Sequence, residues 1–276
     1  MTRNVIFALM AIIGSAGASA QAFADFVDLG TAGNFAVLAA TTVTNTGPSV
    51  IDGGNIGLSP GTSVTGFPPG VLSPPYAFHV ADAVAAQARN DLITAYAYAA
   101  GLVPALDLTG QDLGGMTLTP GVYSFDSSAQ LTGTLTLDAQ GDPNALFVFQ
   151  MGSTLTTASN SSVVTINGGA EPGCNVYWQV GSSATLGTGT NFQGHILALT
   201  SITMNTNANI LYGSVLAING AVTLDSNQIT NCVVPEASSM TLSLIGGGLL
   251  MGMRSLRKRM TGETGNAALV IVETEA

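Results

Sequence analysis

Gly194–Thr200 reads Gly-His-Ile-Leu-Ala-Leu-Thr, and Gly213–Asn219 reads Gly-Ser-Val-Leu-Ala-Ile-Asn. The two segments begin 213 − 194 = 19 residues apart and share a pattern of glycine, polar residue, two aliphatics, alanine, aliphatic and polar residue. A repeat this short cannot bury its own apolar side chains, so successive repeats must stack on one another. The pair therefore predicts a solenoid in which one coil lies over the next.

The same period recurs when Thr-Leu-like pairs are aligned along the chain. The intervening segments of Val, Ile, Leu, Thr and Phe are broken by Gly, Asn and Asp, which is typical of short strands and turns. We expect each strand to pair with its equivalent one coil away, and an insertion between Ser159 and Asn175 to fill the longest gap. The aligned threonines are Thr117, Thr136, Thr154, Thr185, Thr203 and Thr223, with spacings of 19, 18, 31, 18 and 20.

One stretch has the pattern of a helix instead. Residues 80–100 are rich in alanine, and Val80, Val84, Ala88 and Leu92 recur at helical spacing. Asp82 near the start and Gly101 after the end fit helix termini. We predict one long helix over about residues 79–100, lying against a broad apolar surface.

Charge is distributed unevenly along the chain. Between Asp25 and Asp225 there are twelve carboxylates and a single cation, Arg89, so the net charge of this region is 1 − 12 = −11. Nucleic-acid binding requires clustered Lys and Arg. Nucleic acid and anionic membranes are therefore excluded as expected partners.

The N-terminal residues are typical of a secretory signal. Arg3 precedes an apolar run from Val5 to Ile13, and small residues such as Ala18-Ser19-Ala20 follow as a cleavage site. We assign residues 1–24 to a signal peptide and residues 25–233 to one exported domain. The alternative, a retained membrane helix, has too short an apolar run to span a bilayer.

The C-terminal residues have three parts. Val234-Pro235-Glu236-Ala237 is followed by an apolar run to Met253 and then by the cations Arg254, Arg257, Lys258 and Arg259. This order resembles the PEP-CTERM sorting signal of Gram-negative bacteria, although the second proline is missing. The resemblance implies that residues 234–259 enter the membrane and meet a sorting protease, with residues 260–276 as a tail. The alternative is a plain single-span anchor.

Cys174 and Cys232 are the only cysteines in the sequence. An exported location favours a disulfide between them, and two free thiols are the alternative.

A polar pattern follows three of the predicted coil starts. The segments are Thr157–Asn160 (Thr-Ala-Ser-Asn), Thr188–Asn191 (Thr-Gly-Thr-Asn) and Thr206–Asn209 (Thr-Asn-Ala-Asn). They resemble the Thr-Ala/Gly-x-Thr/Asn pattern of the ice-binding-like family of secreted microbial β-solenoids, with Asn207 as a departure. The resemblance extends from Asp28–Ala39 to Asn219–Asp225, and Cys174–Thr185 carries it most specifically.

Membership of this family implies a mainly β fold: a right-handed β-helix of roughly triangular section with one long α-helix packed alongside. It also implies that the partner is the surface of an ice crystal, bound through a flat ladder of Thr and Asn. The ladder residues we expect are Thr157, Ser159, Asn160, Thr188, Thr190, Asn191, Thr206, Asn209 and Ser226. The alternative function is a non-enzymatic adhesin or matrix protein that contacts extracellular polysaccharide.

The sequence offers no catalytic constellation, so we assign no catalytic residue, no metal site and no cofactor. His79 and His195 are far apart in the chain, which favours neither zinc nor a nucleophilic triad. We expect His195 to face solvent and Trp178 to occupy a core or cap position rather than a sugar platform.

Overall fold

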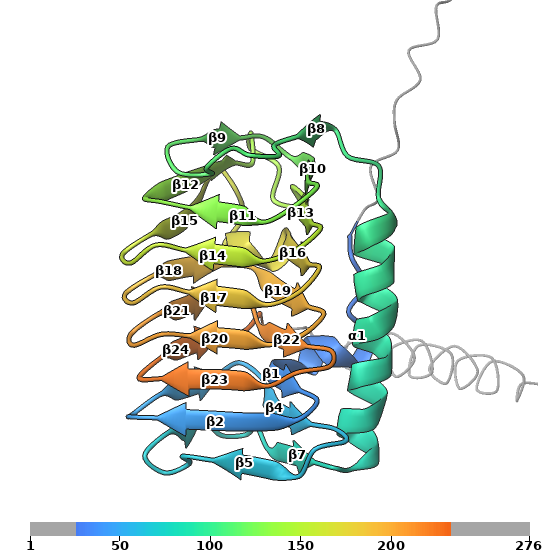
Figure 1. The fold of residues 1–276 in the computed structure, drawn as a ribbon, viewed down its shortest axis with the longest axis vertical. Helices are drawn as coiled ribbons and strands as arrows, with labels where there is room; N and C mark the ends of the chain where they lie inside the picture. Colours follow the sequence, from blue (N-terminus) through green and yellow to red (C-terminus); the bar gives the residue numbers. More distant parts are fainter. Residues whose placement is uncertain (1–25, 233–276) are drawn as a thin grey trace, which may run out of the picture. The chain divides into compact units, whose positions relative to one another are not determined.

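The computed structural model describes residues 26–232. The expected signal peptide (residues 1–24), sorting segment (234–259) and tail (260–276) lie outside these residues. Within residues 26–232, three parallel sheets run along one axis and a single long helix lies beside them (Figure 1). This confirms the predicted β-solenoid with a lateral helix. Across the same residues, no helix combines the length and the apolar character needed to cross a membrane.

Each complete coil contributes one strand to each of the three sheets, which we call sheets A, B and C. In spatial order, sheet A contains β7 (Phe78–Val80), β4 (Asn55–Leu58), β1 (Phe35–Ala39), β22 (Val215–Ala217), β19 (His195–Ala198), β16 (Val176–Val180), β13 (Phe147–Met151), β10 (Gly121–Phe125) and β8 (Leu106–Asp107). Sheet B contains β11 (Ala129–Leu131), β14 (Leu155–Thr157), β17 (Ala184–Leu186), β20 (Ile202–Met204), β23 (Val222–Asp225), β2 (Thr42–Thr46) and β5 (Ser63–Thr65). Sheet C contains β6 (Val71–Leu72), β3 (Val50–Asp52), β24 (Gln228–Thr230), β21 (Asn209–Leu211), β18 (Asn191–Gln193), β15 (Ser162–Ile166), β12 (Thr134–Asp138) and β9 (Thr117–Leu118).

Burial differs between the sheets because, among residues 26–232, only sheet A is covered on its outer side. Every residue of β1, β13 and β16 is buried, since the inner side chains meet the core and the outer ones meet the helix or the N-terminal segment. Strands of sheet B alternate instead, with a buried, an outward-facing and again a buried residue in β14, β17 and β20. This alternation is expected of a sheet with one solvated face.

The helix α1 (Ala83–Gly101) begins later than the predicted residue 79 because Phe78–Val80 form β7, which pairs with β4. Asp82 is the N-cap, and its Oδ1 accepts a hydrogen bond from Ala85 N at 2.8 Å. At the other end Gln150 Nε2 donates to the carbonyl oxygens of Ala99 and Leu102. The side chains that α1 buries recur every three or four residues: Ala85, Ala88, Leu92, Ala95 and Ala99.

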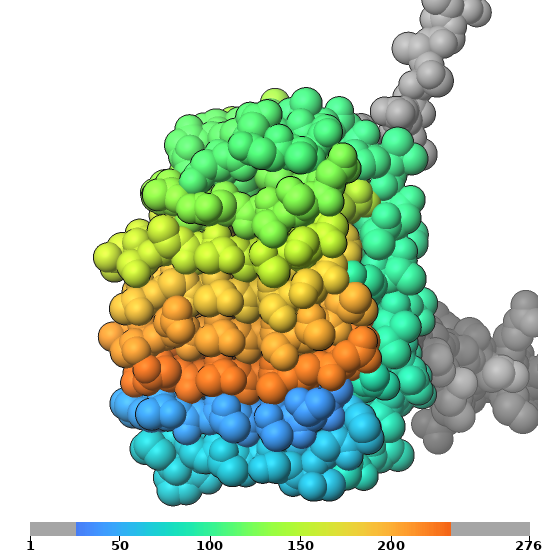
Figure 2. Space-filling view, viewed as in Figure 1, coloured from blue at the N-terminus to red at the C-terminus, as the bar shows by residue number. Residues whose placement is uncertain are grey.

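The path of the chain makes the solenoid discontinuous. The first two coils end at β7, and α1 then carries the chain along the outside of sheet A to the opposite end (Figure 1). The remaining coils return, so that β22, β23 and β24 pair with β1, β2 and β3. In Figure 2 the orange C-terminal coil lies directly on the blue N-terminal coil. We call this contact the seam.

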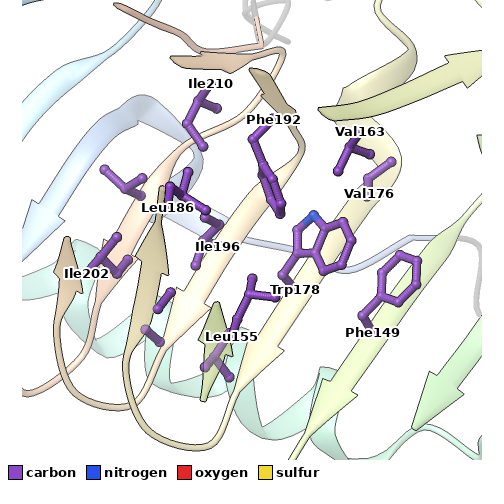
Figure 3. Packing of buried hydrophobic residues seen from close by; sticks show 14 of the residues in the cluster. Phe149, Leu155, Val163, Val176, Trp178, Leu186, Phe192, Ile196, Ile202 and Ile210 are labelled. Atoms are coloured by element: carbon purple, nitrogen blue, oxygen red, sulfur yellow. The ribbon is translucent and has the colours of Figure 1, made fainter. Parts of the chain in front are cut away.

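Aromatic side chains stack on one another in part of the core. Phe149 and Trp178 stack with ring centroids 4.0 Å apart, and Phe192 tilts against the other side of Trp178 at 4.7 Å (Figure 3). The Trp178 indole donates to Gln193 O at 3.0 Å, which satisfies its only polar atom. The expectation that Trp178 is a core residue is therefore confirmed.

The predicted disulfide is present: Cys174 and Cys232 are bonded, with a Cα–Cα distance of 5.8 Å. Cys174 lies at the end of the insertion expected between Ser159 and Asn175, in the short 3-10 helix η2 (Pro172–Asn175); a second one, η1 (Gly30–Asn34), precedes β1.

The expectation that His195 faces solvent is wrong. It is 3% exposed, because its ring stacks on Tyr177 and lies beside the disulfide.

Candidate functional site

The outer surface of sheet B carries a column of outward-facing residues that are in register from strand to strand. Except at Thr65, which Gly66 follows, each one is the middle residue of a triplet whose neighbours point into the core, as in Ile202-Thr203-Met204. The backbone fixes the separation of neighbouring rungs at about 4.8 Å. From one end to the other the column is Gln130, Thr156, Thr185, Thr203, Thr223, Thr44 and Thr65, which we call the threonine column.

A second column runs parallel to the first, two residues earlier in each strand or the turn before it. Because side chains alternate along a strand, residues two apart face the same side, about 6.6 Å from one another. Thr154 Oγ1 donates to Ser128 Oγ at 2.8 Å within this column. Its members are Ser128, Thr154, Ser183, Ser201, Ala221, Thr42 and Ser63, which we call the hydroxyl column.

Most hydroxyl groups of the threonine column have no hydrogen-bond partner within the part of the chain that the structure describes. Thr44 Oγ1 donates to Thr223 Oγ1 at 3.4 Å, and among residues 26–232 the hydroxyls of Thr156, Thr185 and Thr203 make no side-chain hydrogen bond. Those three groups are therefore available to water. Threonine is also stiff at χ1, so little side-chain freedom remains to be lost when such a surface binds.

The two columns contain no ionisable side chain, and the carboxylates of sheet B lie at its margins. Asp225 ends β23, where it receives hydrogen bonds from the hydroxyls of Thr206 and Ser226. Asp112 forms a backbone bridge to Gln130 at the end of the threonine column. The middle of sheet B is thus a neutral surface of hydroxyl and methyl groups.

Five of the ladder residues expected from the sequence lie in the turns between sheets B and C. Ser159, Asn160, Thr188 and Thr206 are exposed, and Ser226 is half-buried. Asn160 and Ser226 have φ values of 58° and 55°, in the left-handed region that Asn and Gly adopt most readily. The turn conformation therefore explains the asparagine at position 160 without reference to a ligand. These residues border sheet B at one edge.

Thr157 and Thr190 were expected on the surface, and this expectation is wrong. Their side chains are inside the corner between sheets B and C, 3% and 0% exposed, and their Oγ1 atoms are 2.8 Å apart. The cause is an error of two residues in the sequence alignment. Thr156, not Thr154, pairs with Thr185, so Thr157 points inward like Leu186 in the next coil.

Asn191 and Asn209 lie on a different face from the threonine column. They are paired residues of β18 and β21 in sheet C, and Asn209 Nδ2 donates to Asn191 Oδ1 at 3.3 Å. Exposed aliphatic side chains, such as Val164 and Leu211, share the outer side of this sheet. The expected ladder residues are thus divided among a corner, the interior and sheet C, and do not form one flat surface.

The sequence did contain a signal for the threonine column. The triplets Ala184-Thr185-Leu186, Ile202-Thr203-Met204 and Val222-Thr223-Leu224 all place threonine between two apolar residues. Period-two alternation of this kind puts the threonine on the solvent side of a half-buried strand. Thr185, Thr203 and Thr223 served only to align the coils, and Thr156, Thr44 and Thr65 were missed.

The titratable groups outside sheet B form structural contacts. His79 Nδ1 lies 2.9 Å from Asp82 Oδ2 at the start of α1, whereas His195 Nδ1 lies 2.8 Å from Ser214 Oγ inside the solenoid. Burial lowers the pKa of His195 to about 4. Within residues 26–232, no group of three or more His, Cys, Asp or Glu side chains could hold a metal ion.

Comparison with known proteins gives one consistent result. Residues 37–230 match the family described as "Ice-binding-like". The chain is 60% identical over 240 residues to an "Ice-binding protein" of Nostoc sp. (strain HG1), covering 84% of this chain and 87% of that protein. The crystal structure of an ice-binding protein from the Antarctic ascomycete Antarctomyces psychrotrophicus superposes with a TM-score of 0.71 at 42% identity, covering 75% of this chain and 98% of the other.

A second solved structure, an ice-binding protein from an Antarctic biological consortium, gives a TM-score of 0.70 at 43% identity and covers 82% of this chain and 96% of the other. The family match covers more than half of the sequence, and the Nostoc relative aligns along most of its length. On these grounds the chain belongs to the ice-binding-like family of β-solenoid proteins.

Proposed function

We propose that this protein binds to ice and that the outer surface of sheet B, with its threonine and hydroxyl columns, makes the contact. The observation that carries the proposal is the register of the threonine column, which holds Thr in six strands and Gln130 at one end. The proposed surface thus differs from the turn residues expected from the sequence, of which Thr188 and Thr206 lie at its edge.

The physical basis is a fixed array of water sites. The backbone ladder sets the rung spacing, and hydroxyl groups without protein partners can each hold a water, while the methyl groups between them limit where other waters settle. A rigid surface loses little conformational freedom on adsorption, so weak contacts can add up to firm binding. Charged side chains, which hydrate strongly, are confined to the margins at Asp225 and Asp112.

The test compares one substitution on sheet B with one on sheet C of a neighbouring coil. Thr203→Tyr places a bulky ring in the threonine column, whereas Gln228→Tyr places the same ring on an exposed position of β24. Thermal hysteresis and ice-crystal shape are measured for purified residues 25–233. We expect Thr203→Tyr to abolish hysteresis and Gln228→Tyr to preserve it. The reverse result would move the site to sheet C, and round crystals with the unaltered protein would reject ice binding.

We also propose that the protein acts outside the cytoplasm and without catalysis. The disulfide supports an oxidising compartment. The N-terminal residues support export. Handling of residues 234–259 by a sorting protease, and contact with a polysaccharide matrix, are further proposals from the sequence. Mass spectrometry of the exported protein tests the processing: cleavage near both ends is expected, and an intact chain of 276 residues would oppose it.

A further inference from the structure

The seam differs from every other contact between coils in the way its register is set. Consecutive coils are joined by the chain itself, so the length of each coil fixes how its strands align with the next. At the seam β23 pairs with β2, whose paired residues Thr223 and Thr44 are 179 positions apart, and no such link exists. The register there has to be set by side chains and backbone contacts.

The hydrophobic pattern alone does not set this register strongly. Val43 and Asn45 point inward from β2, as Val222 and Leu224 do from β23. A slip of two residues would keep inward residues facing inward, because side chains alternate with a period of two. Such a slip would nevertheless place Thr42 or Thr46, instead of Thr44, beside Thr223, and would displace the first two coils by two residues across sheet B.

A buried chain of polar side chains crosses the seam in the corner between sheets B and C. Ser49 Oγ donates to Asn45 Oδ1 and accepts from Asn227 N at 2.9 Å. Asn45, Ser49 and Asn227 are 8%, 0% and 2% exposed. Residues of the C-terminal coil and of the N-terminal coil are therefore joined by a hydrogen bond inside the protein.

The chain of hydrogen bonds continues into the coils on both sides of the seam. Asn227 Nδ2 donates to the carbonyl oxygens of Asn205 and Ala208, at 2.9 and 2.8 Å, in the preceding coil. Asn45 Nδ2 donates to Gly66 O at 2.8 Å in the coil beyond. These bonds anchor each asparagine on its own side of the seam, and the bond from Asn227 N to Ser49 Oγ is the one of this group that crosses it. A shifted register would separate those two atoms and leave buried polar groups without partners, which is more costly than never having had them.

We infer that Asn45, Ser49 and Asn227 are positioning residues of the ice-binding surface. Their hydrogen-bonded chain selects the register in which the C-terminal coil meets the N-terminal coil, and so places Thr44 beside Thr223 on sheet B. Buried polar groups are known to select one register at some cost in stability. The inference rests on the proposed function for its link to ice, but the register itself can be measured separately.

Neighbouring coils suggest how to replace these three polar side chains without leaving voids. Leu224 is the residue of β23 that pairs with Asn45. Ala208 directly precedes β21, just as Asn227 precedes β24 and Ser49 precedes β3, and these three strands pair with one another in that order. The triple variant Asn45→Leu, Ser49→Ala, Asn227→Ala therefore installs residues that adjacent coils already accommodate. Because apolar replacement of a whole buried polar group is often tolerated, we expect this variant to fold.

Two measurements are made on the triple variant. The methyl NMR signals of Thr44 and Thr223 report the register. We expect one set of signals with a Thr44–Thr223 NOE in the unaltered protein, and additional sets of signals in the triple variant. If two registers become equally populated, the first two coils are displaced across sheet B in about half of the molecules. Thermal hysteresis at equal concentration is then expected to fall, because Thr44 and its paired residue Thr65 leave the threonine column in those molecules.

The matched control is Thr157→Leu with Thr190→Ala. These substitutions also remove a buried polar pair from the B–C corner, but between coils that the chain links directly. The control is expected to keep one set of methyl signals and full hysteresis. If the triple variant does not fold, Ser49→Ala is tested alone. This substitution removes the middle member of the hydrogen-bonded group, and it is expected to give extra methyl signals.

A single set of signals with the Thr44–Thr223 NOE, in the triple variant or in a folded Ser49→Ala, would overturn the inference. Absence of hysteresis in the unaltered protein would reject the proposed function but leave the register result standing.

Discussion

Thr44 and Thr223 lie side by side on the outer surface of sheet B, with their Oγ1 atoms 3.4 Å apart, although 179 residues separate them in the chain. The proposed ice-binding surface is thus assembled from both ends of the domain. Its integrity depends on how firmly the last coil is held against the first and against α1.

Two adjacent threonines of β14 should respond in opposite ways to substitution. Thr156 faces solvent in the threonine column, so Thr156→Tyr is expected to lower thermal hysteresis strongly and leave the melting temperature nearly unchanged. Thr157→Ala would remove the partner of Thr190 Oγ1 and of Gly187 N. We expect it to cost about 1–3 kcal/mol of unfolding free energy. Its hysteresis near 0 °C should persist. Calorimetry and hysteresis on both variants check the pair, and equal behaviour would contradict the assignment of faces.

Arg89 is the only cation between Asp25 and Asp225, and we expect it to stabilise the fold. Its Nε donates to Ile218 O at 2.7 Å and its Nη2 donates to Asn219 Oδ1 at 2.9 Å, which ties α1 to the C-terminal coil. Arg89→Met keeps much of the apolar stem but loses both bonds, so we expect a loss of about 2 kcal/mol in chemical denaturation. Asn90→Met, on an exposed position of the same helix, is the control. Equal stability of the two variants would show that the Arg89 contacts contribute little.

The overall fold was predicted from the sequence, whereas the threonine column was missed although its period-two pattern is present in the sequence. The repeat near nineteen residues predicted a solenoid, and the alanine-rich segment predicted α1. Aligning Thr-Leu pairs, however, merged positions from different sheets: Thr117 and Thr136 pair in sheet C, while Thr185, Thr203 and Thr223 pair in sheet B. A linear period does not say which side of a strand a residue faces, because a shift of one residue reverses it. The seam was beyond reach for another reason, since no local pattern reports a pairing across 179 residues.

The disulfide should contribute strongly to the stability of the last coil. Cys232 directly follows Asn231, whose backbone N donates a hydrogen bond to Asp52 O across the seam. The bond of Cys232 to Cys174 closes a loop with a sequence separation of 58. In the chain-entropy model, a loop of this length stabilises the folded state by about 4 kcal/mol. Reduction, or the double substitution Cys174→Ser with Cys232→Ser, should therefore lower the melting temperature by several degrees. An unchanged melting temperature after confirmed reduction would mean that strand pairing alone holds the C-terminal coil in place.

His195 should make the stability of the domain depend on pH in a defined window. Burial lowers its pKa from 6.5 to about 4 in the folded protein, while the unfolded chain retains the ordinary value. Between these values the unfolded state binds a proton that the folded state does not, so stability falls as pH decreases from 6.5 to about 4 and the loss then levels off. The full effect is at most about 3 kcal/mol.

The carboxyl groups of Asp107 and Asp138, whose pKa values are lowered by hydrogen bonds to Thr109 and Asn167, lose their contribution only at lower pH. Melting temperatures measured across the window in the unaltered protein and in His195→Asn separate the two effects. The slope between pH 6.5 and 4 should disappear in His195→Asn. A slope that survives His195→Asn would show that other groups titrate in the window.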